Sequence, residues 1–163
     1  MSYVHLRIHT EFSIVDGSLR VDDAVEAARA DAQGALAITD LNNLFAGVRF
    51  YKAARDAGVK PILGCDVRVV LPEASGQGEA AGLLLLVTDH RGYLNLCELL
   101  SRAWLQGQHG GEARMQWAWL ADDGLHEGLI ALCGARQGAI GRALLAGDEA
   151  RARLLARQHR ELF

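Results

Sequence analysis

The stretch from His5 to Gly17, "HLRIHTEFSIVDG", carries the first regular pattern of the chain. Apolar side chains at positions 4, 6 and 8 alternate with His5, Arg7 and His9. Because successive side chains of a β-strand point to opposite faces, this alternation predicts a strand with the three polar residues on one face. Imidazoles at alternate positions of a strand are typical of a metal site, yet the middle position is Arg7, whose guanidinium cannot ligate a metal. The stretch predicts either a catalytic strand or the remnant of one, and a purely structural role for His5 and His9 also stays open.

Short apolar runs and amphipathic patterns alternate along the rest of the chain. Strands are predicted over 3–8, 35–39, 60–64, 66–71, 83–88 and 128–134, and helices over 21–34, 46–58, 91–107, 138–147 and 149–162, with a helical turn within 115–124. Gly34 and Gly58 are the predicted ends of the first two helices, and Asp89 is the predicted N-cap of the third. Repeated strand–helix units favour an α/β fold with a mostly parallel sheet.

The composition is ordinary for a single globular domain over residues 1–163. Hydrophobic residues make up 50% of the chain and charged residues 23%. The formal net charge is −3, whereas a free-standing nucleic-acid-binding domain usually carries a basic excess. We therefore expect that this chain on its own does not bind DNA tightly.

Three cysteines, Cys65, Cys97 and Cys133, lie far apart in the sequence and form no C-x-x-C pair. This spacing argues against a disulfide framework and a zinc ribbon. Each lies in an apolar run, which predicts buried, reduced thiols in a cytoplasmic protein. The first ten residues lack the pattern of a signal peptide, and the longest apolar run, Leu83 to Val87, is too short to span a membrane.

Polar residues that follow predicted strands are the next candidates, because α/β proteins place ligands at the carboxyl ends of parallel strands. Asp40 and Asn42 in "TDLNNL" could serve a metal or a phosphate, although a helix N-cap role for Asp40 is equally open. Asp66 in "LGCDV" is either a ligand or a solvated turn carboxylate. Asp16, followed by a glycine, is typical of a turn.

One glycine-rich stretch is excluded as a nucleotide site. The loop "GQGEAAG" is similar to the G-x-G-x-x-G pattern but has one residue too many. It precedes a strand, whereas the dinucleotide motif follows a strand and opens a helix. We expect a polar loop over residues 73–82.

Four stretches, in the order "HLRIHTEFSIVDG", "ALAITDLNNL", "FYKAARDAGVKPILGCDV" and "GYLNLCELLSRA", together resemble one family. They are similar to the polymerase-and-histidinol-phosphatase (PHP) domains found at the N-terminus of bacterial replicative DNA polymerase III alpha subunits. The resemblance runs from Val4 to about Arg142. It implies a distorted seven-stranded β/α barrel with metal ligands at the carboxyl ends of its strands. We expect this chain to hold the first five or six strands, as an incomplete barrel that lacks the polymerase active site.

The resemblance also implies which metal ligands are lost. Metal-active relatives read H-x-H-T in the first strand, where this chain has Arg7 and then His9. They read T-D-H-G after the second strand, where this chain has Leu41 at the histidine position. They often have a histidine just before the "LLLLV" strand, where Gly82 stands here. Three imidazole positions are therefore occupied by Arg7, Leu41 and Gly82.

The acidic positions of the family site are still present. Asp66 stands where relatives have a glutamate, with a shorter reach. A fixed positive charge at Arg7 argues against a metal centre, and we expect Arg7 to pair with Asp16 or Asp66 instead. The predicted vestigial site comprises Arg7, His9, Asp16, Asp40 and Asp66. We expect no catalytic residue and no tightly bound metal there, while a phosphate or sulfate near Arg7 stays open.

Two functional hypotheses follow from the resemblance. The first is a non-catalytic scaffold in a cytoplasmic DNA-directed DNA polymerase, which docks a proofreading exonuclease subunit and contacts DNA only through the full polymerase. The second is a residual metal-dependent phosphoesterase, pyrophosphatase or 3′–5′ exonuclease built on His9, Asp40 and Asp66. The number of lost ligands favours the first.

The expected incompleteness of the barrel has a structural consequence. An open edge should lie near Leu129 to Cys133, while the strands over 3–8 and 35–39 should pair with each other. An uncovered strand edge is a template for association. We therefore expect the chain to self-associate, to borrow an element from a neighbouring copy, or to be clearly less stable than a full domain.

Overall fold

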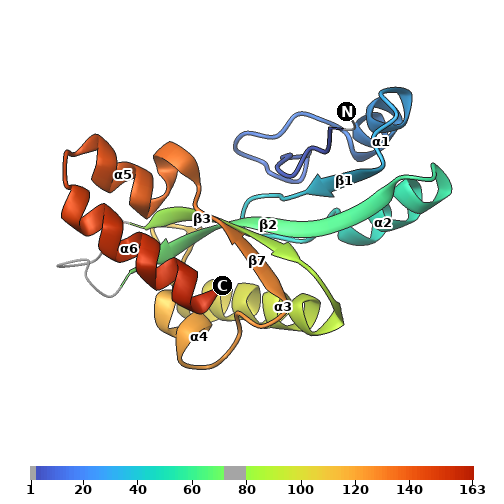
Figure 1. The fold of residues 1–163 in the computed structure, drawn as a ribbon. Helices are drawn as coiled ribbons and strands as arrows, with labels where there is room; N and C mark the ends of the chain where they lie inside the picture. Colours follow the sequence, from blue (N-terminus) through green and yellow to red (C-terminus); the bar gives the residue numbers. More distant parts are fainter. Residues whose placement is uncertain (1–2, 72–79) are drawn as a thin grey trace. The chain divides into compact units, whose positions relative to one another are not determined.

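The computed structural model describes residues 3–71 and 80–163 (Figure 1). These residues form two compact units, a first unit up to Asp66 and a second unit from Val67 to Phe163. Helices and strands alternate in both, which confirms the predicted α/β class. A single domain over residues 1–163 and a distorted seven-stranded barrel stay predictions.

The first unit packs two helices against a parallel pair of strands. It contains α1 (Val21–Ala30), β1 (Ala35–Ile38), α2 (Gly47–Asp56) and the first part of β2 (Lys60–Val70). β1 and β2 run parallel, with Ala35 opposite Lys60 and Ile38 opposite Leu63. The apolar stripes of both helices meet this pair in one core, which contains Val21, Ala24, Val25, Ala28, Leu36, Ile38, Ala46, Phe50, Ala54 and Val59.

The N-terminal segment lies along β1 without forming a regular strand. The Ala37 amide donates to the His5 carbonyl oxygen at 2.9 Å, and the Thr39 amide donates to the Ile8 carbonyl oxygen at 2.8 Å. Between these two bonds the chain advances by two residues along β1 but by three residues along the N-terminal segment. One extra residue of this kind is the pattern of a β-bulge. The predicted pairing of 3–8 with 35–39 is confirmed by these bonds, but the regular strand is wrong because the extra residue breaks the ladder.

Further boundaries differ from the predictions. α1 ends at Ala30 instead of Gly34, and Ala32 takes a left-handed φ of 53° that usually favours glycine. The strands predicted over 60–64 and 66–71 are one strand, β2, because the glycine between them is extended and buried within it. α2 ends at Asp56, two residues before the predicted Gly58, which has a left-handed φ of 73° just after the helix.

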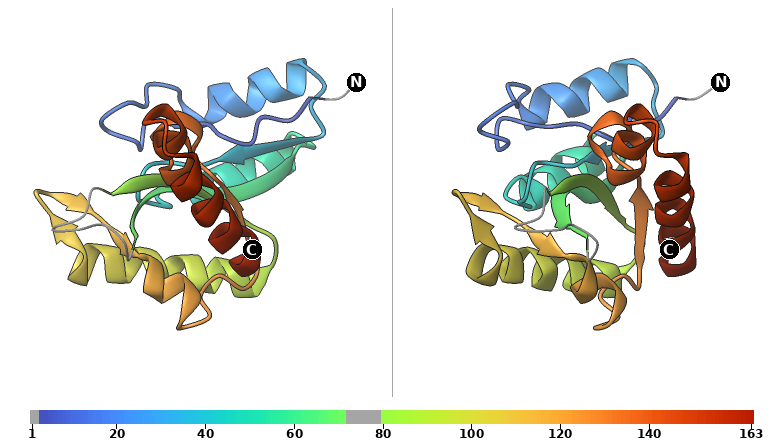
Figure 2. Two further views of the ribbon diagram at one scale, coloured as in Figure 1. Left: turned by 60° about the vertical axis from the view of Figure 1, so that its left-hand side comes forward. Right: turned by 90° about the vertical axis from the view of Figure 1, so that its left-hand side faces the viewer.

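The second unit is built around the buried strand β3 (Ala81–Val87). β3 pairs antiparallel with β7 (Leu129–Leu132), and the end of β2 pairs in parallel with β6 (Met115–Gln116). The remaining elements are α3 (His90–Gln106), β4 (Gln108–His109), β5 (Glu112–Ala113), α4 (Trp117–Ala121), a 3-10 turn (Ala135–Gln137), α5 (Ala139–Leu145) and α6 (Glu149–Leu162). Figure 2 shows α5 and α6 packed against each other.

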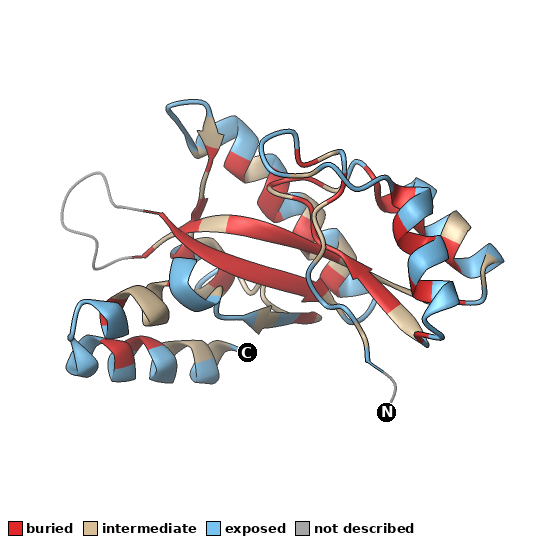
Figure 3. Cartoon of the chain, turned by 90° about the horizontal axis from the view of Figure 1, so that it is seen from above, coloured by how far each residue is buried: buried red, intermediate tan, exposed pale blue. Residues whose placement is uncertain are grey.

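The β1–β2 and β2–β6 pairs are parallel as predicted, whereas the β3–β7 pair is antiparallel. The connection between these strands contains two helices and the β4–β5 hairpin, whereas a parallel crossover commonly uses one helix. Figure 3 shows that β3 is buried along most of its length. The predicted loop over 73–82 lies largely outside the described residues.

β7 lies at the end of its strand order, which confirms an edge near residues 129–133. Ile130 and Leu132 are 50% and 37% exposed. Cys133 follows this edge strand and is exposed, so its predicted burial is wrong, while Cys65 is buried and Cys97 is half-buried. Within the described part of the chain, no helix is both long and apolar enough to cross a membrane.

Asp89 caps α3 as predicted, and this contact can be tested. Its Oδ1 accepts a hydrogen bond from the Gly92 amide at 2.9 Å. We expect Asp89→Ala to lower the free energy of unfolding by about 1 kcal/mol, because the amide loses its partner. Asp89→Asn keeps an acceptor and is the control. Chemical denaturation of both variants measures the difference, and equal stability of the two would contradict the capping role.

Candidate functional site

The candidate site is centred on the Asp66 carboxylate, on β2 in the first unit. Its Oδ2 accepts a hydrogen bond from Arg7 Nε at 2.7 Å, and His9 Nε2 lies 3.2 Å from the same oxygen. The Asp66 side chain is only 5% exposed, whereas that of Arg7 is 52% exposed. Of the two predicted partners of Arg7, the structure shows Asp66.

His9 links this carboxylate to a second one. Its Nδ1 lies 2.9 Å from both carboxylate oxygens of Asp16. An imidazole has two N–H donors only when it is protonated, so contact of both ring nitrogens with carboxylates favours the imidazolium. The hydrogen bond to Asp66, reinforced by Asp16, raises the pKa of His9 above its ordinary value despite the opposing effect of burial.

The pKa of Asp66 responds to the same contacts. Burial acts to raise the pKa of this carboxyl, but the hydrogen bonds from His9 and Arg7 outweigh burial and hold it below its usual value. The cluster therefore contains two cations, Arg7 and protonated His9, and two anions, Asp16 and Asp66. Its formal charges cancel without any bound ion.

Asp40 lies next to this cluster but is satisfied in a different way. It is 2% exposed, and it accepts hydrogen bonds from the Thr10 amide at 2.6 Å, the Thr10 hydroxyl at 2.8 Å and the Ser13 hydroxyl at 2.8 Å. The Ser13 hydroxyl oxygen in turn accepts from the Leu41 amide at 2.9 Å. These bonds fix the loop from Thr10 to Gly17 on the carboxyl end of β1. The N-cap alternative for Asp40 is wrong, since Ala46 precedes α2.

The other predicted residues either contact Asp66 only through their main-chain atoms or lie away from the cluster. Leu41 forms a parallel bridge with Asp66, and the Asn42 amide donates to the Asp66 carbonyl oxygen at 2.9 Å. His5 lies apart from the cluster, with Nδ1 3.0 Å from Gln33 Oε1. Gly82 belongs to β3 in the second unit.

The sequence patterns did not indicate Thr10 and Ser13, whose hydroxyls are the partners of Asp40. Both are fully buried, although threonine and serine are mostly exposed in proteins. The only signal for them was their position beside "HLRIH" in the opening stretch, because no periodicity reports a hydroxyl that bonds to a carboxylate distant in sequence.

The donor set does not fit the metal centre that the resemblance implies for metal-active relatives. A metal would need a neutral His9, but both His9 ring nitrogens contact carboxylates, and the Arg7 guanidinium adds a fixed positive charge at Asp66. Among residues 3–71 and 80–163, no three or more His, Cys, Asp and Glu side chains are arranged to hold a metal ion. The geometry instead supports an internal ion-pair cluster.

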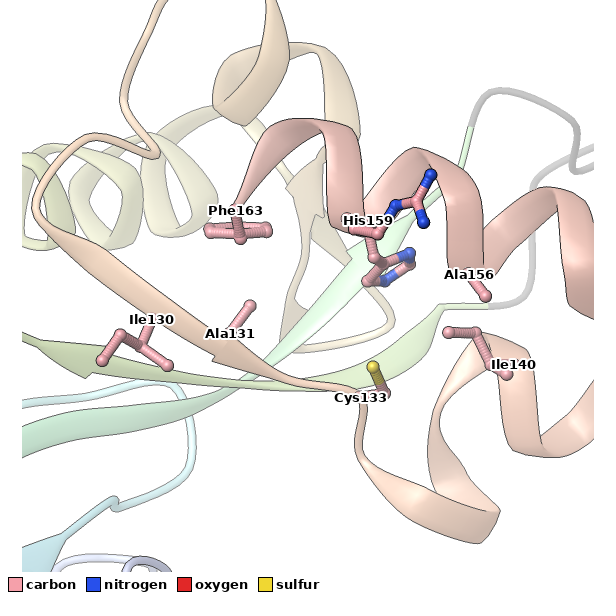
Figure 4. Close-up of a pocket in the computed structure, with 8 residues that line it drawn as sticks. Ile130, Ala131, Cys133, Ile140, Ala156, His159 and Phe163 are labelled. Carbon is pink, nitrogen blue, oxygen red and sulfur yellow. The ribbon is translucent and has the colours of Figure 1, made fainter.

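A separate pocket of about 400 Å³ lies in the second unit, between β7 and the two C-terminal helices. Figure 4 shows Ile130 and Ala131 on one side of it and His159 and Phe163 on the other. His159 donates from Nδ1 to the Leu155 carbonyl oxygen at 2.8 Å. The pocket is mostly apolar and contains none of the predicted site residues.

Comparison with known proteins gives the family. The model of the PHP domain matches residues 5–163, so the chain belongs to the PHP-domain family, as the sequence resemblance implied. Over its whole length it is 45% identical to the DNA polymerase III subunit alpha of Pseudomonas aeruginosa, of which it covers 14%. It is 40% identical over 148 residues to the subunit of the same name from Escherichia coli, covering 91% of this chain and 12% of that protein. The chain thus spans a small part of these relatives.

Among solved structures, the chain is similar to an amidohydrolase from Chromobacterium violaceum that contains bound sulfate and no metal. The two are 23% identical, with a TM-score of 0.47. The alignment covers 61% of this chain and 32% of the amidohydrolase.

The raised pKa of His9 makes the stability of the chain depend on pH. A histidine whose pKa is higher in the folded state contributes stability that is fully present below its ordinary pKa of about 6.5 and is lost as the pH rises through the raised value. We therefore expect the melting temperature to fall as the pH rises from about 6.5 through the raised pKa of His9.

Thermal unfolding of wild type and His9→Gln across this range measures the effect, with His109→Gln as the control at an exposed position. The pH dependence should be weaker in His9→Gln and unchanged in His109→Gln. The same pH dependence of the melting temperature in wild type and His9→Gln would show that the imidazolium does not contribute to stability.

Proposed function

We propose that this chain is the PHP region of a replicative DNA polymerase III alpha subunit and acts there as a non-catalytic scaffold. Relatives named as this subunit share 40–45% identity with it. The polymerase reaction itself would belong to parts of the protein that lie outside the matched length. Within the scaffold the Arg7–Asp66 cluster has a structural role.

The main support for this proposal is that Arg7 and His9 both hydrogen-bond to Asp66 Oδ2. A hydrolytic site needs an oxygen or nitrogen lone pair free to bind a metal or to accept a proton from water. In this cluster both ring nitrogens of His9 contact carboxylates, and the Arg7 guanidinium at Asp66 repels a metal cation. The alternative of a residual phosphoesterase is therefore the weaker one, and so is a 3′–5′ exonuclease.

Docking of a proofreading exonuclease subunit is the second part of the proposal. The loop that Asp40 fixes carries Ile14 and Val15, which are 92% and 86% exposed. Apolar side chains held out into water on a fixed loop are typical of a protein–protein contact. Phe45, 73% exposed, follows Asn43, whose Nδ2 donates to the Phe12 carbonyl oxygen in the same loop at 3.1 Å.

The catalytic part of the proposal is tested with the protein in its full natural length. Primer extension should be present, while hydrolysis of model phosphodiesters and pyrophosphate should not exceed background with or without added zinc or manganese. Elemental analysis should find much less than one metal per PHP region. Hydrolysis that survives repurification and disappears in Asp66→Ala would overturn the non-catalytic role, and absence of primer extension would overturn the polymerase assignment.

The docking part is tested by a double substitution, Ile14→Ser with Val15→Ser. Because neither side chain is packed in the core, we expect unchanged unfolding and at least about tenfold weaker binding of the exonuclease subunit. Leu105→Ser is the control, since Leu105 is 83% exposed in the second unit. Binding measured by surface plasmon resonance should be unchanged in the control. Equal affinity of the double variant and wild type would exclude this loop as the docking surface.

A further inference from the structure

A pocket of about 500 Å³ lies at the amino ends of β1 and β2 in the first unit. Gly34 precedes β1, Lys60 is the first residue of β2, and Tyr51 and Arg55 reach the pocket from α2. The Asp66 cluster lies near the carboxyl end of β1, so the pocket is a separate feature. Its volume is within the range of small-ligand sites, about 300–1,000 Å³.

Tyr51 and Arg55 form one wall of the pocket as a preformed pair. The guanidinium carbon of Arg55 lies 5.7 Å from the centre of the Tyr51 ring, and Arg55 Nη1 donates to the Tyr51 hydroxyl oxygen at 3.0 Å. These contacts hold the cation against the ring although Tyr51 is 46% exposed. A ring and a fixed guanidinium together offer a stacking surface and several N–H donors.

The positive charge of the pocket is uncompensated. Among residues 3–71 and 80–163, no carboxylate forms an ion pair with Arg55 or Lys60. By contrast, Arg7, Arg29 and Arg49 in the same unit each pair with an aspartate or glutamate. Two unpaired cations beside an aromatic ring favour an anionic ligand with a flat group.

Glycines keep the pocket open. A Cβ atom built at Gly34 or Gly58 would meet no heavy atom within 4 Å. The left-handed φ of 73° at residue 58 favours glycine there. Gly34 has no left-handed φ, and α1 ends before it, at Ala30. No left-handed φ requires glycine at residue 34, and the space that a side chain there would enter is open at the pocket wall.

We propose that this pocket binds a nucleoside 5′-phosphate group, either as a free nucleotide or as one nucleotide of single-stranded DNA. The phosphate lies between Arg55 and Lys60, and the base stacks on the Tyr51 side of the pocket, as in single-strand binding sites. With two cations in a chain of net charge −3, the binding is weak and sensitive to salt. For single-stranded DNA the logarithm of the affinity falls with a slope of about −0.7 for each neutralised phosphate.

The test uses the full-length protein and photo-crosslinking, because crosslinked peptides report the site even when other regions bind DNA. The probes are 5-iodo-2′-deoxyuridine 5′-monophosphate and a thymidine oligonucleotide with one 5-iodo-2′-deoxyuridine. Near-ultraviolet irradiation followed by peptide mass spectrometry should identify a crosslink at Tyr51. Labelling by the mononucleotide assigns a free nucleotide, and labelling by the oligonucleotide alone assigns single-stranded DNA.

Matched variants decide whether the crosslink reports the pocket. Lys60→Gln removes one cation and Gly34→Leu fills the opening, so each should lower Tyr51 labelling at least about fivefold. Lys52→Gln removes an exposed cation from the same helix outside the pocket and should leave labelling unchanged. No crosslink at Tyr51 with either probe, or equal labelling in all three variants, would overturn the proposal. Primer extension by the same preparations tests the polymerase assignment separately.

Discussion

The Asp66 carboxylate lies almost wholly out of water and accepts from both Arg7 and His9. A buried charge is expensive unless opposite charges and hydrogen bonds compensate it, so every neighbour of this group is constrained. His9 reaches Asp66 with one nitrogen and Asp16 with the other, which ties the end of the opening loop to β2. The charge balance around Asp66 therefore holds the loop in place together with the Asp40 hydrogen bonds.

Two buried carboxylates lie side by side in this unit and are stabilised by different means. Asp66 accepts hydrogen bonds from cations, whereas Asp40 accepts hydrogen bonds from neutral donors of Thr10 and Ser13. Hydroxyl and amide donors cannot titrate near neutral pH, while His9 can. The unit therefore combines a carboxylate held by neutral donors with a neighbouring contact that depends on the protonation of His9.

The sequence patterns predicted most helices and the buried strands, because their apolar periodicity follows from the core they form. They also predicted the Asp89 cap and the pairing of Arg7 with a site carboxylate. They failed where the outcome depends on long-range contacts. The extra residue between His5 and Ile8 and the antiparallel direction of β7 leave no local trace in the chain. The buried hydroxyls of Thr10 and Ser13 are equally invisible, since residue type alone predicts exposure.

The ion pair between Arg7 and Asp66 also restricts which single changes the chain can tolerate. Replacing Arg7 by a histidine would remove one of the two cations that compensate Asp66, while Leu41 would still offer no lone pair to an incoming ion. The intermediate would thus lose charge balance before any ligand set was complete. A metal site in this framework would require several simultaneous replacements, because each one alone is neutral or unbalances the charge around Asp66.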